Sequence, residues 1–265
     1  MLKLKISAFI ILLCVSTGSA QRNSPASQAE LAEITERGRQ LAAYDMAAWY
    51  STDAVMALKP DESSVTRYVA NKTDSGWTVA YGRLNEKRDR FLIVYEATQG
   101  ATPKEFATKK YSPPKEDTGF YLLAAKAIET ALADFKGADR PYNVAVLPTK
   151  ANQMYVYVVP AQTKHGIFPL GGDVRYLISQ DGSKIVEKRQ MHKAILEFET
   201  SNNMEAGYHV AVLDDVPEDT DVFHVLSRTP SVPEWIATRK YVYVVERDGT
   251  IKYVGEAEKI LGIKK

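Results

Sequence analysis

The sequence of 265 residues contains 45% hydrophobic and 25% charged residues, with 15 glycines and 12 prolines. This composition excludes collagen-like, low-complexity and wholly disordered chains, because it supplies ample apolar material for a packed core. The 34 lysines and arginines nearly balance the 33 aspartates and glutamates, so the charge gives no support for nucleic acid as a main partner. The length suits one large domain or two small ones.

The first twenty residues carry the pattern of a signal peptide. Lys3 and Lys5 form a basic start, an apolar run interrupted only by Ser7 follows, and small residues precede a cleavage position after Ala20. The apolar run is about half as long as a helix that spans a bilayer. We therefore expect a periplasmic or secreted mature chain, with an uncleaved anchor or a buried amino-terminal helix as the alternative.

Cleavage after Ala20 would leave a mature chain without cysteine, because the single cysteine, Cys14, lies inside the leader. Such a chain has no disulfide, no thiolate nucleophile and no cysteine metal ligand. The mature chain is nevertheless long enough to be stable by burial alone. No second apolar run approaches the length of a transmembrane segment, so we expect the processed protein to be soluble.

A long helix is predicted near the start of the mature chain. Ser27 and Glu30 form a capping box at its beginning, and Lys59–Pro60 ends it near Leu58. Its apolar and alanine positions suit an amphipathic helix packed on a sheet. Gly38 is a weak point that could divide this segment into two helices.

Strand patterns then recur through the chain, often around short turns with Asp-Gly or charged residues. Ten segments show this pattern: residues 77–84, 90–97, 142–147, 154–160, 174–179, 184–199, 208–213, 222–226, 240–246 and 251–255. Residues 98–118 contain three prolines and are predicted to be a loop or irregular crossing. Residues 120–136 are predicted to form a second long helix ended by Gly137, and residues 256–263 a short final one.

Two long helices among about ten strands indicate the α+β class. The predicted architecture is a mostly antiparallel sheet built from hairpins, with the two long helices packed against it. The strands do not alternate regularly with helices, which argues against doubly wound and barrel α/β folds. Since no repeat or glycine-rich linker divides the chain, we expect a single domain over residues 21–265, with a soft boundary near residues 137–140 as the alternative.

Familiar catalytic motifs are absent from the sequence, including the nucleophile elbow, the phosphate loop, the dinucleotide fingerprint and the His-Glu-x-x-His helix. Residues 214–221 hold five carboxylates and invite a calcium interpretation. They lack the glycine and the terminal glutamate of an EF-hand loop. A solvated acidic loop between two strands is the expected structure, because runs of charge are usually solvated.

The four histidines fall within sixty residues: His165, His192, His209 and His224. The last three lie on the more apolar faces of predicted strands. One hypothesis is that His192, His209 and His224 bind a divalent metal such as zinc, leaving a position for a water that could support hydrolysis. Four carboxylates could complete the ligand set or act as base: Asp173, Asp214, Asp215 and Glu197. The alternative is that each histidine bonds its own neighbour and has only a structural role.

Two further groups are candidates for binding. Asp45, Trp49 and Asp53 share one face of the first helix and could form an acid/base pair, a sugar platform or two solvated carboxylates. The glycines of residues 169–173 could admit a ligand to the backbone or could simply turn the chain into Val174.

Tyrosines alternate in two strand-like runs, at Tyr155 and Tyr157 and at Tyr241 and Tyr243. Aromatic faces of this kind bind glycans or peptides, and they also stabilise ordinary sheets. The sequence thus supports two functions. The first is a non-catalytic, envelope-associated module that binds a protein, a peptide or an envelope component. The alternative is a metal-dependent hydrolase that uses the histidines, and the sequence assigns no catalytic residue to it.

Overall fold

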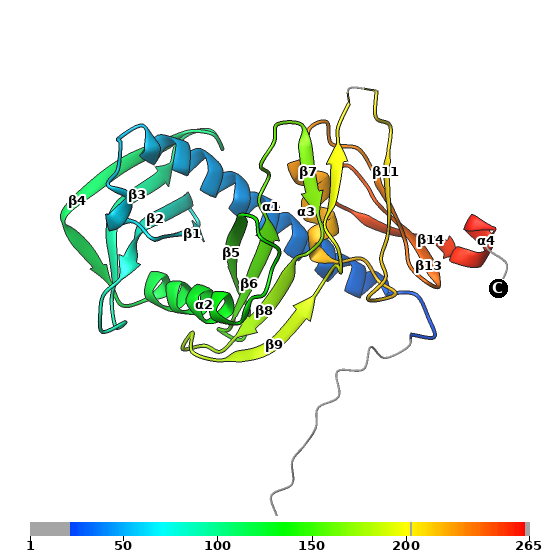
Figure 1. Cartoon of the computed structure of the whole chain (residues 1–265), viewed down its shortest axis with the longest axis horizontal. Coiled ribbons are helices and arrows are strands. Elements are labelled where there is room, and N and C mark those ends of the chain that lie inside the picture. The colour runs from blue at the N-terminus through cyan, green and yellow to red at the C-terminus, as the bar shows by residue number, and fades with distance from the viewer. Residues whose placement is uncertain (1–21, 202, 263–265) are drawn as a thin grey trace, which may run out of the picture.

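Figure 1 shows the computed structural model, which describes residues 22–201 and 203–262. The predicted signal peptide, its cleavage site and Cys14 lie outside these residues. The described residues form four α-helices, three four-stranded sheets and a two-stranded ribbon. Nearly all strand pairs are antiparallel, so the predicted α+β class with hairpin-built antiparallel sheet and two long helices is confirmed.

Helix α1 (Gln28–Met56) runs through the molecule and contacts elements of all three large sheets (Figure 1). The Ser27 side chain accepts a hydrogen bond from the Glu30 N–H at 3.2 Å, which is one half of the predicted capping box. The Glu30 carboxylate pairs with Arg22 and not with the Ser27 backbone. The helix is continuous at Gly38, so the possible division at this residue does not occur. A Cβ at Gly38 would lie 2.4 Å from the Val222 Cβ, so glycine here lets helix α3 (Asp219–Ser227) cross α1 closely.

The amino-terminal sheet is an antiparallel meander of β1 (Arg67–Thr73), β2 (Gly76–Leu84), β3 (Phe91–Gln99) and β4 (Phe106–Asp117). The predicted hairpin of residues 77–84 and 90–97 corresponds to β2 and β3. The prediction of a loop over residues 98–118 is wrong, because most of this segment is β4. Two of its prolines, Pro113 and Pro114, are tolerated because β4 is an edge strand and its pairing with β3 skips them.

The middle sheet consists of β5 (Tyr142–Pro148), β6 (Met154–Pro160), β8 (Val174–Ile178) and β9 (Ile185–Gln190), with helix α2 (Phe120–Asp134) packed against it. The predicted single strand over residues 184–199 is wrong. The chain leaves the sheet after β9, and β10 (Leu196–Glu199) instead pairs with β7 (Ile167–Leu170) in the separate ribbon. His192 therefore lies in a connection and not within a strand.

The carboxy-terminal sheet contains β11 (Gly207–Val210), β12 (Glu234–Ala237), β13 (Tyr241–Val245) and β14 (Ile251–Glu256), and the short helix α4 (Ala257–Leu261) follows it. The pair of β11 and β12 is parallel, and α3 forms the crossover between them. The predicted strand over residues 222–226 is therefore wrong. Glu218 and Asp221 form a capping box that starts a helix there, and its Val222 and Val225 are fully buried.

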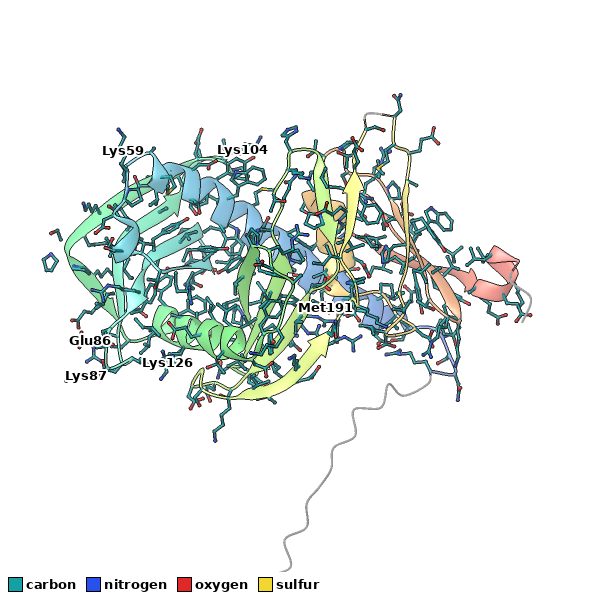
Figure 2. The ribbon with its side chains drawn as sticks, in the orientation of Figure 1. Lys59, Glu86, Lys87, Lys104, Lys126 and Met191 are labelled. Atoms are coloured by element: carbon teal, nitrogen blue, oxygen red, sulfur yellow. The ribbon has the colours of Figure 1, made fainter. Side chains whose placement is uncertain are left out.

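The three large sheets follow one another along α1, from the amino-terminal sheet at the left of Figure 1 to the carboxy-terminal sheet at the right. Met191, in the connection after β9, is buried where the middle sheet meets α3 (Figure 2). The single domain over residues 21–265 and its possible boundary near residues 137–140 stay predictions.

No helix among the described residues combines the length and the apolar character needed to cross a membrane.

Candidate functional site

Three separate elements bring His192, His209 and Asp221 together in the interior. His192 lies in the connection between β9 and β10, His209 in β11, and Asp221 in the first turn of α3. Only 7%, 3% and 0% of these residues is exposed, respectively. The Oδ1 atom of Asp221 lies 3.0 Å from His192 Nε2 and 3.1 Å from His209 Nε2. One carboxylate oxygen thus faces both imidazoles.

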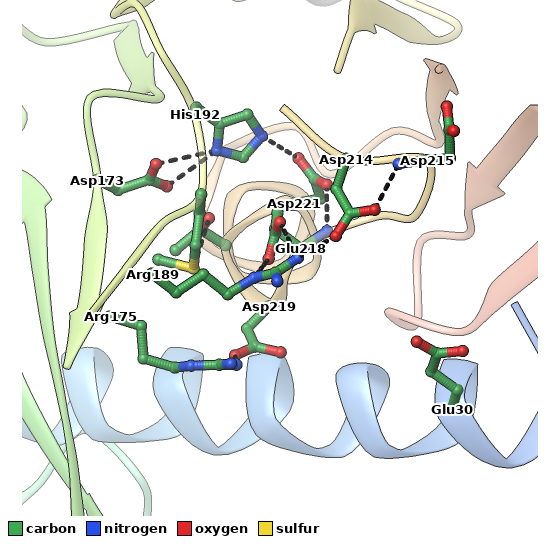
Figure 3. Close-up of polar contacts among 12 residues, drawn as sticks. Glu30, Asp173, Arg175, Arg189, His192, Asp214, Asp215, Glu218, Asp219 and Asp221 are labelled. Atoms are coloured by element: carbon green, nitrogen blue, oxygen red, sulfur yellow. Dashed lines mark hydrogen bonds and ion pairs between the residues drawn. The ribbon is translucent and has the colours of Figure 1, made fainter. Parts of the chain in front are cut away.

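The other nitrogen of each imidazole contacts a second carboxylate. His192 Nδ1 lies 3.0 Å and 3.2 Å from the two oxygens of Asp173, as the dashed lines in Figure 3 show. His209 Nδ1 lies 3.0 Å from Glu234 Oε1 at the start of β12. Both outer carboxylates are buried. The result is a continuous row of three carboxylates with an imidazole between each neighbouring pair.

The charges of this row reinforce one another. Burial opposes protonation of His209, but the Asp221 carboxylate raises its pKa to about 9. Burial likewise opposes protonation of His192, and the charges of Asp173 and Asp221 raise the His192 pKa well above its ordinary value. Burial would raise the pKa of Asp221, but the two imidazolium charges hold it far below its ordinary range. In the metal-free protein, these carboxylate charges therefore favour the protonated form of both imidazoles.

His224, the third histidine of the predicted metal site, has a different set of contacts. It lies in α3, and its Nε2 accepts a hydrogen bond of 2.9 Å from Arg228 Nη1. Burial and the Arg228 charge lower the pKa of His224 to about 3, so this imidazole is neutral. Arg228 Nη1 also donates to Glu234 Oε2 at 2.7 Å. His224 thus supports the row through Arg228 and Glu234, while the fourth histidine, His165, is exposed.

The acidic segment of residues 214–221 is largely buried, so the prediction of a solvated loop is wrong. Asp219 is fully buried, and its carboxylate accepts from Tyr157 at 2.8 Å, from Arg37 at 2.9 Å and from Arg175. Figure 3 shows Asp219 and Arg175 beside the helix α1. Arg37 belongs to α1, whereas Tyr157 and Arg175 belong to the middle sheet, so these contacts hold the start of α3 against both. A negative side chain is also favourable at a helix N-terminus.

Arg189 of β9 forms a second attachment for this segment. It donates to the Glu218 oxygens at 2.9 Å and 2.6 Å and to Asp214 at 3.0 Å. Burial raises the pKa of Glu218 to about 7 although the Arg189 charge opposes this change. Asp215 and Glu197, which were also predicted to complete the metal site or act as base, have arginine partners as well. Asp215 lies 3.7 Å from Arg239, and the exposed Glu197 lies 3.2 Å from Arg140.

The glycines of residues 169–173 form the turn into β8. Gly171 and Gly172 have φ values of +92° and +67°, which favour glycine. A Cβ at Gly171 would lie 2.1 Å from the carbonyl oxygen of Ala194. This close crossing holds the connection that carries His192 beside Asp173.

The alternating tyrosines belong mainly to the interior. Tyr157 and Tyr243 are fully buried, and their hydroxyls donate to Asp219 at 2.8 Å and to the Asp215 carbonyl at 3.2 Å. These hydrogen bonds favour the structural interpretation of the aromatic pairs.

Five cavities in the described part of the chain are lined by residues other than His192, His209 and Asp221. The largest of the five, about 500 Å³, lies beside Trp77, whose indole is only 8% exposed and has the Lys72 ammonium 5.3 Å from its ring centre.

Another cavity of about 380 Å³ is lined by the predicted carboxylate and indole group of α1. Its lining includes Asp45, Trp49 and Asp53, together with Asn143 of β5. Burial raises the pKa of Asp45 to about 6, and a hydrogen bond from Asn143 opposes the shift. The structure therefore brings Asp45, Trp49 and Asp53 to one cavity.

We expect Asp45→Asn to raise the free energy of unfolding, relative to wild type, by about 1–2 kcal/mol more at pH 7 than at pH 4. The folded-state pKa lies above the ordinary value, so the unfolded chain releases the Asp45 proton first. The wild-type protein therefore loses stability as the pH rises from about 4 to 6, whereas the asparagine variant, which has no carboxyl group at this position, does not. Because the side chain is half-buried, the effect is smaller than the full shift implies. Urea unfolding at the two pH values measures it.

Asp53→Asn is the matched control, since it makes the same substitution at an exposed position of the same helix. If the free energies of unfolding of Asp45→Asn and wild type differed by the same amount at both pH values, the prediction would be contradicted.

Comparisons with protein-family models, with curated proteins and with solved structures found no match for this chain.

Proposed function

We propose that the protein is an exported, non-catalytic binding module of the cell envelope, and that it binds a saccharide in the cavity beside Trp49. The observation that carries this proposal is the indole of Trp49, which is 60% exposed at a cavity of about 380 Å³. A cavity with an apolar ring and a few hydrogen-bonding groups is typical of small-ligand sites.

The ring of Trp49 is accompanied by that of Tyr50, with ring centres 6.2 Å apart and planes inclined by only 18°. Large exposed aromatic surfaces on a protein usually have a binding role. Asp45, Asn143 and Gln162 line the same cavity and offer carboxylate and amide groups to sugar hydroxyls. The larger cavity beside Trp77 lacks such a platform, because Trp77 is almost completely buried.

The spacing of the two aspartates favours binding over glycoside hydrolysis. Asp45 and Asp53 are eight residues apart on a continuous helix, which separates their Cα atoms by about 12 Å along the axis. Glycosidases place their two carboxyl groups about 5–9.5 Å apart. Side chains on one helix face point in the same direction, so the two carboxyl groups keep roughly the separation of their Cα atoms.

Burial favours a structural over a hydrolytic role for the histidines. A hydrolase built on His192 and His209 needs a route for substrate and water, and the five cavities are lined by other residues. His224, the third histidine of the hydrolase hypothesis, bonds Arg228 instead. For these two reasons we propose the binding module in preference to the hydrolase.

We expect Trp49→Ala to weaken saccharide binding about tenfold, since stacking on an aromatic ring contributes on the order of 1 kcal/mol. The test uses calorimetry on the mature chain from Gln21 with soluble oligosaccharides, both neutral and N-acetylated. Trp235→Ala is the control, because its indole is 38% exposed but lies on β12 outside the cavity. Equal binding by Trp49→Ala and wild type, or no binding of any of these sugars, would refute the proposal.

A further inference from the structure

We propose that His192, His209 and Asp221 form a structural site for one divalent transition-metal ion, and that this ion joins the middle sheet to the carboxy-terminal sheet. The inference is independent of the proposed saccharide cavity, which shares no residue with this group.

The first support is the convergence of three ligand types. One nitrogen from each of His192 and His209 and one oxygen of Asp221 all lie within 4.8 Å of one another. Zinc binds nitrogen and carboxylate oxygen at about 2.0–2.2 Å, so ligands of a tetrahedral ion lie roughly 3.3–3.6 Å apart. The observed separations of 3.0 Å and 3.1 Å from the Asp221 oxygen need to open by only a few tenths of an ångström.

The second support is an unsatisfied nitrogen inside the group. His209 Nε2 is buried and has no hydrogen-bond partner among the described residues, although the Asp221 oxygen is only 3.1 Å away. The contact is close but is not aligned as a hydrogen bond. Buried polar atoms rarely stay without a partner. A metal ion between the three side chains would replace the proton on this nitrogen and bind the lone pair that the proton leaves.

The third support is the orientation of the two imidazoles. Metal-binding histidines almost always donate their second N–H to a carboxylate, a carbonyl or a water, and this bond directs the other nitrogen to the metal. Asp173 and Glu234 occupy this position for His192 and His209 at 3.0 Å each. Arg228 in turn holds Glu234 at 2.7 Å. Both Nε2 atoms therefore lie close to Asp221 Oδ1, while each Nδ1 is occupied by its own outer carboxylate.

The enclosure of the group indicates what the ion would do. Two imidazoles and a carboxylate leave one position of a tetrahedral ion for water, as in catalytic zinc sites. The three side chains, however, are buried and come from three different segments of the chain: the β9–β10 connection, β11 and α3. We therefore assign the ion a structural role, in which it replaces the two imidazole protons and holds these segments together.

The test uses the mature chain from Gln21, purified without a histidine tag, stripped with a chelator and titrated with Zn²⁺. We expect one Zn²⁺ per chain and a Tm that rises by roughly 5–10 °C when free Zn²⁺ exceeds the Kd a hundredfold. Co²⁺ in place of Zn²⁺ should give the intense visible spectrum of a tetrahedral site. A folded wild-type chain that binds neither ion and keeps its Tm would overturn the inference.

Matched variants identify the ligands. Asp221→Asn should weaken Zn²⁺ binding at least a hundredfold, whereas His224→Gln should retain one Zn²⁺ per chain because His224 bonds Arg228. Asp173→Asn, which alters only the partner of His192, should weaken binding about 10- to 100-fold. If Asp221→Asn does not fold, the Asp173→Asn affinity and the wild-type Co²⁺ spectrum decide. Loss of metal in His224→Gln, or unchanged affinity in Asp173→Asn, would contradict the assigned ligand set.

Discussion

We expect Asp221→Ala to lower the free energy of unfolding of the metal-free mature chain by about 3–5 kcal/mol. Asp221 is fully buried and is the only carboxylate of the row that faces both His192 and His209. Its removal would leave two buried imidazoles without their shared counter-charge. It would also remove the acceptor of the Glu218 N–H, a hydrogen bond of 2.7 Å at the start of α3. Chemical denaturation of the two proteins measures the difference.

Asp214→Ala is the control for this prediction. Asp214 belongs to the same acidic segment and also contacts an arginine, but its side chain is 24% exposed. Ion pairs with such access to water contribute about 0–1 kcal/mol, so the control should be nearly as stable as wild type. If the two variants lost the same stability, the buried row would not hold the three segments together.

We expect Gly38→Ala to lower the free energy of unfolding by about 2–3 kcal/mol, because the added methyl group overpacks the contact between α1 and α3. The new Cβ would lie 2.4 Å from the Val222 Cβ and 2.6 Å from the Asp219 carbonyl oxygen. One of these atoms belongs to the backbone, so α3 itself must shift. Such a shift would displace Asp221 and should also weaken Zn²⁺ binding.

The sign of this effect is diagnostic. Alanine in the middle of a helix is normally about 1 kcal/mol better than glycine, so helix propensity alone predicts stabilisation. A comparison of Gln40→Gly with Gln40→Ala measures that propensity at an exposed position of α1, where the alanine variant should be more stable by about 1 kcal/mol. A more stable Gly38→Ala protein would show that the two helices separate without cost.

The elements with strong local signals were predictable. The capping box of Ser27 and Glu30 and the stop at Lys59–Pro60 predicted helix α1, and the structure places it at Gln28–Met56. The predicted hairpin around the charged turn corresponds to β2 and β3. Each of these signals acts within a few residues, so no knowledge of the rest of the chain is required.

The incorrect predictions fall into two kinds. In one, two local patterns favoured different secondary structures; in the other, the extent of a strand depended on which strand it paired with. Residues 222–226 have the apolar, β-branched character of a strand, but the capping box of Glu218 and Asp221 begins a helix there. That capping box was the signal in the sequence that could have identified α3 and, with it, Asp221. Residues 184–199 alternate as one strand would, yet β9 pairs with β8 while β10 pairs with β7. Nothing in the alternation marks the change of partner.

By itself, the sequence determined the α+β class, the long helices and the main hairpins. It also singled out His192 and His209, two of the three residues that we propose as metal ligands. Only the tertiary structure decided that Asp221 meets His192 and His209, and that His224 bonds Arg228 instead. These three residues lie on different segments, and their spacing along the chain matches no compact ligand motif. Their meeting depends on α3 crossing α1 at Gly38 and on the Gly171 turn beside Ala194, which are long-range contacts. Local propensity carries no information about such contacts, because they are set by which surfaces pack together.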